Sequence, residues 1–419
     1  MNFQEYICRL GGPELDATAF LKAMCMPPET SVKINRRKYH PPGGIESSMP
    51  EIGYEGLQQV SWCDSGFYLS ERPKFTLNPL MHAGVFYVQD ASSMIYETIV
   101  KKLIRDYDLP EKPAIADLCA APGGKTTSMI NAVPDGSPVV ANEFVAQRAR
   151  ILSENLIKWG YPDIMVCNSP TDRFRNLAGC FHIVAVDAPC SGEGMMRKDE
   201  EARNQWSEGL VMKCAAMQRE ILSDAAEALA PGGFLIFSTC TFNTIENEDN
   251  VIFLTEELGL QPVNMDFPAD WKIGRQLGSP YPALRFMPHL TRGEGLFVAV
   301  MRKPGSSGPV RHDKLAQNLR KHVKVVLNGI PRTIMKGRVE APTTEWSLSV
   351  DFPSDKFPEV EVSKSTALSY LRHEAITLPP ETEKGYVALT FKGYRIGMTK
   401  NIGTRANNLY PAEWRIRNL

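Results

Sequence analysis

Ala114-Ile115-Ala116-Asp117-Leu118-Cys119-Ala120-Ala121-Pro122-Gly123-Gly124-Lys125 is the stretch that decides the fold. Its first five residues are a short apolar run typical of a buried strand, and the two glycines permit a tight turn into a helix that begins near Lys125. Such a turn brings backbone N–H groups at a helix N-terminus close to a ligand. The stretch matches neither the dinucleotide pattern G-x-G-x-x-G nor the phosphate loop G-x-x-x-x-G-K-[ST]. A plain strand-to-helix turn without a ligand is the alternative.

The segments that follow alternate between strand and helix patterns. Strands are predicted at 138–142, 164–166, 183–186, 234–237 and 296–301, and helices at 146–159, 210–229 and 247–258. This alternation predicts an α/β fold with a mostly parallel sheet covered on both faces. Ligands of such folds bind beyond the carboxyl ends of the strands.

The length of 419 residues predicts two or three domains. We expect a first domain at 1–80 and the α/β core at 81–303. Lys303-Pro304-Gly305-Ser306-Ser307-Gly308-Pro309 has the composition of a linker, which we place at 304–310. The region 311–419 ends in strand-like runs at 385–391 and 394–398, which indicate a small β-rich module.

The net charge of −1 hides an asymmetry between the two parts of the chain. Residues 311–419 carry 18 Lys and Arg against 11 Asp and Glu, whereas residues 1–310 carry 29 against 37. A basic C-terminal region favours a polyanionic partner such as a nucleic acid, the alternative being a merely solvated surface. We expect the run Arg36-Arg37-Lys38 to add phosphate contacts.

Nine scattered cysteines form no C-x-x-C pair, so we expect neither a metal site nor a disulfide framework. An odd number of thiols suits a reducing cytoplasm. No apolar run of membrane-spanning length and no secretory signal are evident, so we expect a cytoplasmic protein with no membrane partner. We also expect a monomer.

Glu143 stands at the end of the second predicted strand. An acidic residue at that place binds the ribose hydroxyls of a nucleoside, although it can equally cap a helix. We expect no basic residue to stand beside Glu143 and accept a 2′-phosphate. Together with Gly123 and Gly124 it predicts an adenosine-containing cofactor, and Asn168, after the third strand, is a candidate adenine contact.

Cys190 and Cys240 follow the fourth and fifth predicted strands, which are usually neighbours. A cysteine at a strand end is more often a small buried hydrophobe, and that interpretation suits the other cysteines, but polar residues and glycine follow these two. Asp187 lies three residues before Cys190. Two thiols and a carboxyl group fit the methylation of cytosine at carbon 5: a thiolate adds to carbon 6, and an acid near ring nitrogen 3 relieves the developing charge. Lys125 is a candidate for lowering the pKa of a thiol.

These segments together resemble the Nol/Nop/Sun family of RNA cytosine-5 methyltransferases, which use S-adenosylmethionine. Asp117 to Lys125 is similar to the cofactor loop of the family, 187–192 to its Pro-Cys motif and 238–241 to its Thr-Cys motif. The resemblance implies that Cys240 is the nucleophile and Cys190 assists product release. It also implies a Rossmann-like core and a cofactor site formed by Cys119, Ala120, Ala121, Pro122, Gly123, Gly124, Lys125, Glu143, Arg148, Asn168 and Asp187.

A finer resemblance is to the bacterial F-type enzymes that methylate 16S ribosomal RNA. It rests on 192–199 and 86–94, and on a tail similar to the PUA-like RNA-binding module of those enzymes. It implies that 1–80 and the module ending 311–419 bind RNA, either as ribosomal RNA or within an assembling subunit. The alternatives are a transfer RNA methyltransferase of the same family, a DNA cytosine-5 methyltransferase with Cys190 as nucleophile, and a non-catalytic ribosome assembly factor.

Overall fold

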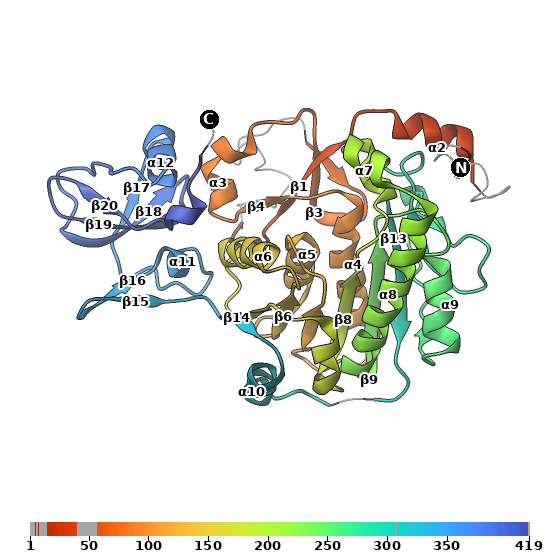
Figure 1. Ribbon diagram of the computed structural model, residues 1–419. Coiled ribbons are helices and arrows are strands. Elements are labelled where there is room, and N and C mark those ends of the chain that lie inside the picture. Colours follow the sequence, from red (N-terminus) through yellow and green to blue (C-terminus); the bar gives the residue numbers. More distant parts are fainter. Residues whose placement is uncertain (1–4, 6, 8–14, 40–56, 307, 418–419) are drawn as a thin grey trace.

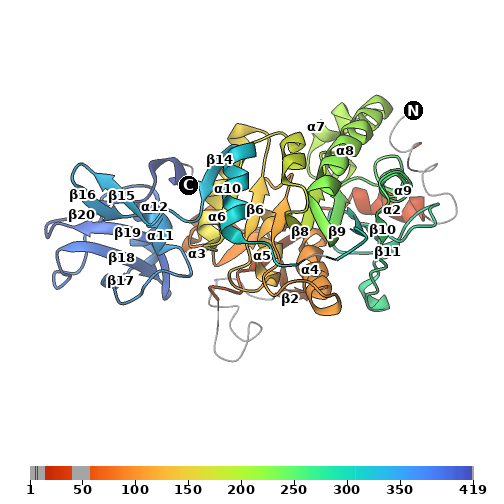
Figure 2. The ribbon, with the colours of Figure 1, turned by 90° about the horizontal axis from the view of Figure 1, so that it is seen from below.

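The computed structural model describes residues 5, 7, 15–39, 57–306 and 308–417. Figure 1 shows a central layer of strands flanked by helices, with the C-terminal module, in blue, standing at one end. The view from below separates that module from the core more clearly (Figure 2). No helix within these described ranges is long and apolar enough to cross a bilayer.

The central sheet has the order β11-β12-β13-β9-β8-β5-β6-β7-β14, with β10 paired to β13. Its five middle strands are parallel, and β13 and β14 flank them in antiparallel pairings. The strands are β5 (Ile115–Asp117), β6 (Val139–Asn142), β7 (Ile164–Cys167), β8 (Phe181–Asp187), β9 (Leu229–Thr239), β10 (Gln261–Pro262), β11 (Gly274–Arg275), β12 (Leu284–Phe286), β13 (Leu296–Arg302) and β14 (Val325–Asn328). The predicted α/β fold with a mostly parallel sheet is confirmed.

Alternate residues of the central strands enter two separate apolar cores, because successive side chains of a strand point to opposite faces. Ile183 belongs to one core and Val184 to the other. The first core includes side chains of α4 (Ile95–Asp106), α5 (Gly124–Ala132) and α6 (Ala146–Trp159). The second includes side chains of α8 (Glu208–Ala228), α9 (Glu248–Glu256) and α10 (His312–His322). The sheet is therefore covered on both faces, as expected.

The N-terminal part is a four-stranded antiparallel sheet of order β2-β3-β1-β4. Its elements are α2 (Ala17–Met24), β1 (Thr30–Ile34), β2 (Gln58–Val60), β3 (Cys63–Leu69), η4 (Phe75–Leu77), α3 (Pro79–His82) and β4 (Phe86–Val88). The last strand lies beyond the boundary expected at residue 80, since Val88 pairs with Val32 of β1.

The C-terminal module is built on a sheet of order β17-β18-β19-β20 and a separate hairpin of β15 and β16. Its elements are β15 (Thr333–Lys336), β16 (Val339–Pro342), α11 (Thr344–Ser347), β17 (Glu359–Glu361), α12 (Lys364–Leu371), β18 (Gly385–Phe391), β19 (Tyr394–Asn401), β20 (Ala406–Asn408) and η9 (Ala412–Trp414). It contacts the core where the Val350 amide donates to the Gly160 carbonyl (3.0 Å), and it contacts the N-terminal part where Tyr394 stacks on Tyr39.

The sequence analysis placed residues 312–328 with the C-terminal region, but the structure places them in the core. Leu315 and Leu319 of α10 are buried in the second apolar core, and β14 pairs with β7 as the last strand of the central sheet. The segment that follows the expected linker therefore completes the core. The remaining short elements of the core are η5 (Ser92–Met94), η6 (Thr171–Leu177), η7 (Glu193–Arg197), α7 (Glu200–Gln205) and η8 (Ala269–Trp271).

Candidate active site

Two thiols meet at the carboxyl ends of the neighbouring strands β8 and β9. Asp187, the last residue of β8, is in register with Ser238 of β9. Because the strands are parallel, the loops that follow them leave the sheet at the same edge. Cys190 and Cys240 lie in these loops, and their Sγ atoms are 3.2 Å apart. The two side chains are partly buried.

The shared environment affects the protonation of Cys190. Its contact with Cys240 and its burial raise the pKa of the Cys190 thiol well above the usual value. Cys190 is therefore protonated at neutral pH, and the Cys240 sulfur 3.2 Å away is a hydrogen-bond partner, with either sulfur able to donate.

Asp187 and Lys125 form an ion pair beside the thiols. Lys125 Nζ lies 2.8 Å from Asp187 Oδ2, and the Ser238 hydroxyl donates to Asp187 Oδ1 over 2.7 Å. Burial opposes the charge on Lys125, but the carboxylate of Asp187 outweighs burial, so the pKa of Lys125 is raised. Lys125 is thus held as a cation by Asp187. The hydroxyl of Tyr96 extends the network by donating to Ser238 over 2.9 Å.

Two buried carboxylates fix the loops that carry the thiols. Glu193 accepts hydrogen bonds from the amides of Phe242 (2.7 Å) and Asn243 (3.0 Å), so the loop after β8 holds the loop after β9. Glu246, which follows β9, accepts from the Ser191 amide in the loop after β8 over 3.0 Å, so each loop supplies a carboxylate that binds the other. The sequence analysis missed both residues. Glu193 was visible beside the Pro-Cys segment, but nothing in the sequence shows that these acids are buried.

The loop from Cys119 to Gly124 connects β5 to α5 and lies at the same edge of the sheet. Gly123 has φ +110°, a left-handed conformation that favours glycine, and α5 begins at Gly124. The Ala120 amide donates to the Asn142 carbonyl over 2.9 Å, which fixes the loop against β6. The fully buried Nζ of Lys33, from the N-terminal sheet, donates to the Gly124 carbonyl over 2.9 Å.

Asp117, at the end of β5, has an unsatisfied oxygen. The Thr126 hydroxyl donates to Oδ2 over 2.6 Å, whereas Oδ1 is buried with no hydrogen-bond partner among the described residues. Burial raises the pKa of Asp117 to about 7. An orphaned carboxylate oxygen beside a helix N-terminus fits a ligand that brings N–H or O–H donors and a positive charge, as S-adenosylmethionine does.

Glu143 follows β6 and is 4% exposed. Its Oε1 accepts from the Val145 amide over 2.8 Å, and its Oε2 lies 3.3 Å from Nη1 of Arg148. The expectation that no basic residue stands beside Glu143 is therefore wrong, because the first turn of α6 brings Arg148 back over it. Arg148 also donates to the Ala121 carbonyl over 2.8 Å, so it joins Glu143 to the loop after β5.

The side-chain amide of Asn168 supports the backbone of the loop after β6. Its nitrogen donates to the carbonyls of Glu143 (2.9 Å) and Phe144 (2.8 Å). A direct adenine contact of Asn168 stays a prediction. The aromatic ring of Phe144 is 67% exposed beside Glu143, and it offers an apolar face at this edge that the sequence analysis missed.

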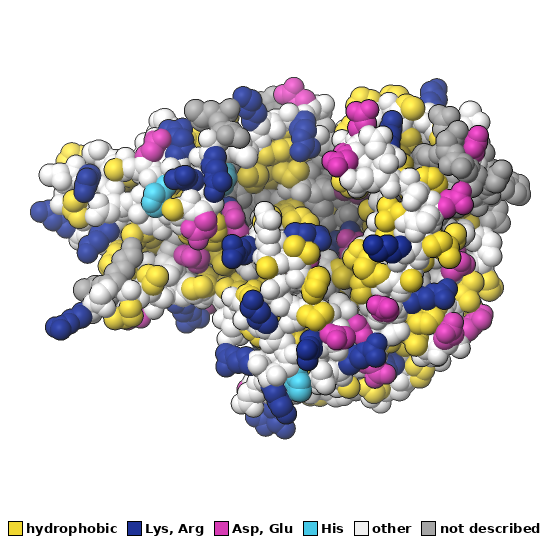
Figure 3. Space-filling model, in the orientation of Figure 1, with side chains coloured by type: hydrophobic (Ala, Val, Ile, Leu, Met, Phe, Trp, Pro, Cys, Tyr) yellow, Lys and Arg dark blue, Asp and Glu magenta, His cyan; other side chains and the backbone are white. Residues whose placement is uncertain are grey.

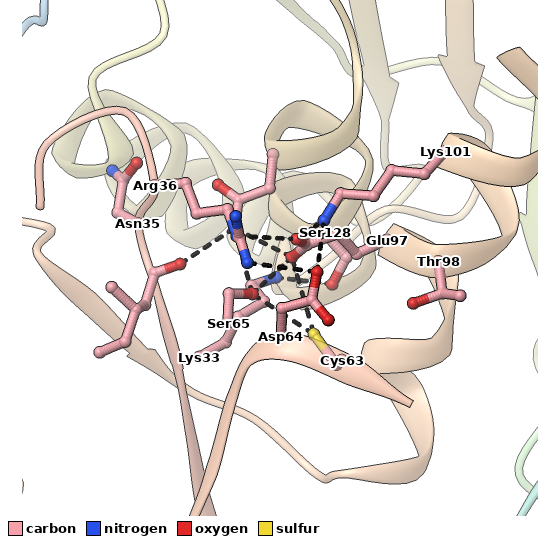
Figure 4. Close-up of polar contacts among 12 residues, drawn as sticks. Lys33, Asn35, Arg36, Cys63, Asp64, Ser65, Glu97, Thr98, Lys101 and Ser128 are labelled. Carbon is pink, nitrogen blue, oxygen red and sulfur yellow. Dashed lines mark hydrogen bonds and ion pairs between the residues drawn. The ribbon is translucent and has the colours of Figure 1, made fainter. Parts of the chain in front are cut away.

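The run Arg36-Arg37-Lys38 is engaged inside the molecule. Arg36 lies 3.4 Å from the buried Glu97, within a polar cluster that also contains Ser65 and Lys101 (Figure 4). Arg37 donates to the Ile130 and Val133 carbonyls, and Lys38 to the Ala83 and Lys158 carbonyls. These internal contacts engage the run, because it follows β1 into the interface with the core, and its expected phosphate contacts stay a prediction.

A cavity of about 440 Å³ lies between the N-terminal part and η7. Arg72, Asp90, Arg197 and Lys198 are among its lining residues. It adjoins the thiol loops, since Asp90 Oδ1 accepts from the Glu294 amide (2.9 Å) and the Glu294 carbonyl lies close to Gly194 beside Cys240.

Comparisons with known proteins agree with this arrangement. Three sequence models match: the N-terminal domain of 16S rRNA methyltransferase RsmF at residues 2–91, 16S rRNA methyltransferase RsmB/F at 107–302, and the methyltransferase RsmF PUA domain at 357–416. Ribosomal RNA small subunit methyltransferase F of Aeromonas hydrophila is 28% identical, over 98% of this chain and 96% of that protein. The protein of the same name from Salmonella arizonae is 36% identical, over 68% of this chain and 60% of that protein.

Solved structures show the same fold. The crystal structure of NSun6 from Pyrococcus horikoshii with SFG has a TM-score of 0.61 at 18% identity, and covers 73% of this chain and 98% of that one. A methyltransferase homologue from Pyrococcus horikoshii has a TM-score of 0.58 at 23% identity, with coverages of 71% and 93%. The Rossmann-like core and the C-terminal PUA-like module are confirmed, and so is S-adenosylmethionine as the cofactor of the family. The chain belongs to the RsmF family of S-adenosylmethionine-dependent 16S rRNA methyltransferases.

Proposed function

We propose that this protein transfers a methyl group from S-adenosylmethionine to carbon 5 of a cytosine in 16S ribosomal RNA, through a covalent bond between Cys240 and carbon 6. The observation that carries the proposal is the thiol pair: Cys190 and Cys240 have their Sγ atoms 3.2 Å apart at the edge of the sheet where the cofactor loop also lies. One thiol suffices for addition to the ring, and a second supports a separate release step.

In the proposed sequence the Cys240 thiol first gives its proton to water and adds as the thiolate to carbon 6, which places electron density on carbon 5. Bound S-adenosylmethionine supplies an electrophilic methyl group. After methylation a base removes the carbon 5 proton, the electron pair restores the double bond between carbons 5 and 6, and the Cys240 thiolate leaves. Cys190, held as a thiol by its raised pKa, is not that base, but its Sγ lies 3.2 Å from the Cys240 sulfur and its S–H is placed to donate a hydrogen bond to the departing thiolate.

Asp187 is proposed to face ring nitrogen 3 together with the Lys125 cation paired to it, which offsets the negative charge that develops there during the addition. Its Oδ2 is shared with Lys125 and its Oδ1 with Ser238, so the carboxyl group is fixed before the substrate binds. Lys125 keeps a positive charge next to the electron-rich ring. Cys119, Ala120, Ala121, Pro122, Gly123, Gly124, Glu143, Arg148 and Asn168 are proposed to surround the cofactor, with Glu143 accepting from the ribose.

RNA recognition is proposed to involve the N-terminal domain, expected at 1–80, and the PUA-like module that ends 311–419. The cavity supports this assignment by its place, because it lies between the N-terminal part and η7 and has Arg72 and Lys198 in its lining.

Denaturing gel electrophoresis of the protein incubated with 16S ribosomal RNA and cofactor tests the proposal. We expect Cys190→Ala to accumulate a covalent protein–RNA complex, because it can add to the ring and methylate it but releases the product poorly. Cys240→Ala and the double variant should form none and should lose activity by several orders of magnitude. Cys214→Ala, which changes a buried thiol of α8, is the matched control and should behave as the wild type.

The other outcomes separate the alternatives. A complex formed only by Cys240→Ala would reverse the two roles, as in a DNA-type enzyme. A complex formed with transfer RNA and not with ribosomal RNA would identify transfer RNA as the substrate. Absence of any complex and of methyl transfer by the wild type would favour a non-catalytic assembly factor.

A further inference from the structure

The basic excess of the C-terminal region is concentrated in a short segment. Residues 311–324 contain five Lys and Arg against one Asp, a net charge of +4. Residues 325–419, which include the PUA-like module, contain 13 against 10, a net charge of +3. More than half of the excess therefore belongs to α10 and the turn before β14, which are parts of the catalytic core.

Helical geometry gathers this charge on one face of α10. Leu315 and Leu319 are four residues apart and point into the second apolar core. Lys314 and Lys321 are seven residues apart, on the opposite side of the helix, and Arg320 and Lys324 flank them. All four cations are exposed, and Figure 3 shows Lys and Arg side chains gathered over α10. We call Lys314, Arg320, Lys321 and Lys324 the α10 surface.

The cations of the α10 surface have no acidic partner among the residues that the structure describes. The ion pair of this segment joins Arg311 to Asp313, and none of the four side chains lies within 4.0 Å of a carboxylate of a described residue. Some cations of the C-terminal module do have acidic partners, since Arg332 pairs with Asp351 and Arg395 with Glu359. Unneutralised charge of one sign is unfavourable in a folded protein, and an anionic partner would offset it.

The α10 surface reaches the edge of the sheet that carries the candidate site. The Asn168 amide donates to the Lys324 carbonyl and the Lys324 amide donates to the Ser169 hydroxyl, both over 2.8 Å. Asn168 in turn holds the loop at Glu143. One end of the surface is therefore fixed to the loop next to the proposed cofactor site.

We propose that the α10 surface binds the sugar–phosphate backbone of the RNA substrate, as a contact separate from the N-terminal domain and the PUA-like module. The inference deepens the proposed function and rests on RNA being the substrate. Four unpaired cations along a helix and the turn after it fit a row of phosphates, and they carry no means of reading bases, so the contact would position the RNA without selecting its sequence.

The test compares two variants of the full-length protein. Lys314→Gln, Lys321→Gln and Lys324→Gln are combined in one variant, and Lys112→Gln, Lys213→Gln and Lys272→Gln in the control. All six lysines are exposed, and the charge change is the same. Binding of a 16S ribosomal RNA fragment is measured between 50 and 300 mM salt, and circular dichroism and cofactor calorimetry check that both variants are folded.

We expect the α10 variant to bind RNA on the order of tenfold more weakly, with the slope of log K against log salt reduced by about 2–3, because each phosphate contact contributes about 0.7–0.9 to that slope. The control should keep the wild-type slope. Equal slopes in the wild type and both variants would contradict the proposal that the α10 surface binds RNA, even if methylation proceeds. If the slope is reduced in the α10 variant but the wild type transfers no methyl group, the proposed function is refuted, whereas RNA binding by the α10 surface is supported.

Discussion

At the scale of single residues, the charged side chains of the candidate site form ion pairs with one another. Lys125 is paired with Asp187, and Arg148 with Glu143. Each cation therefore has a carboxylate partner and is not an unpaired charge that acts on a thiol alone. These pairs hold both carboxylates in place before a ligand binds.

Glu143→Ala should weaken binding of S-adenosylmethionine by about 1–3 kcal/mol, the usual cost of leaving a buried donor without its acceptor. Glu143→Gln keeps the shape and should lose less. Isothermal titration calorimetry measures both, and an unchanged affinity in the alanine variant would remove Glu143 from the cofactor site.

Lys33 should make stability depend on pH. Burial lowers its pKa to about 7, although Glu97 and Cys63 act in the opposite direction. In the unfolded chain the pKa returns to about 10.4. Between pH 7 and 10 the unfolded state therefore binds one more proton, and the free energy of unfolding rises with pH.

Lys33→Met removes this effect, so its stability should rise less steeply over that range, by at most about 1.4 kcal/mol per pH unit. Urea unfolding at pH 7, 8, 9 and 10 measures the difference, with Lys213→Met as the control at an exposed site. If both variants follow the wild-type pH profile, Lys33 does not change its protonation on folding.

At the scale of secondary structure elements, the loops after β8 and β9 act as one unit. The Gly194 amide donates to the Cys240 carbonyl over 2.8 Å. A Cβ atom at Gly194 would lie 2.7 Å from that carbonyl oxygen and 2.8 Å from the Glu294 carbonyl oxygen. Both are backbone atoms, so they cannot move aside without shifting the loop.

Gly194→Ala should consequently displace Cys240 and lower kcat by at least about tenfold, since a shift near 1 Å at a reacting group has effects of up to about a hundredfold. Cofactor affinity should change little, because the atoms nearest to a Cβ atom at Gly194 belong to Cys240 and Glu294 and not to the loop after β5. Gly209→Ala on α8, where a Cβ atom has space, is the control. Wild-type kcat in Gly194→Ala would show that the two loops move independently.

The sequence was most informative where the pattern is local. The helix predicted at 146–159 is α6, and the strand predicted at 385–391 is β18. The placement of Cys190 and Cys240 at neighbouring strand ends also followed from the alternation of strands and helices. Contacts between distant segments were not predictable: β14 pairs with a strand about 160 residues earlier, and nothing in its sequence Val325-Val326-Leu327-Asn328 shows which strand it joins. The partners of the Arg36-Arg37-Lys38 run were missed for the same reason.

At the scale of the whole molecule, the core continues beyond the expected linker. Leu319 is fully buried in the second apolar core, and β14 covers the outer edge of β7. A chain that ends at residue 310 lacks both. A chain that ends at residue 329 keeps both and lacks only the C-terminal module.

The chain 1–329 should therefore remain folded and bind S-adenosylmethionine, whereas the chain 1–310 should be unstable and aggregate, because an open sheet edge is a template for association. Light scattering and calorimetry distinguish the two. In the full-length protein, Leu319→Ala should lower the free energy of unfolding by about 2–5 kcal/mol. Equal solubility and cofactor affinity of the two truncated chains would mean that α10 and β14 are dispensable for the core.

The position of β14 also has a consequence for the time at which the enzyme becomes complete during its synthesis. β7 is made first, and its outer partner is translated about 160 residues later. At about 5–20 residues per second, this delay is roughly 10–30 s. Throughout that interval the nascent chain carries an unpaired strand edge next to the loop of Glu143. The sheet that bears the candidate site is finished only when the ribosome has passed residue 328.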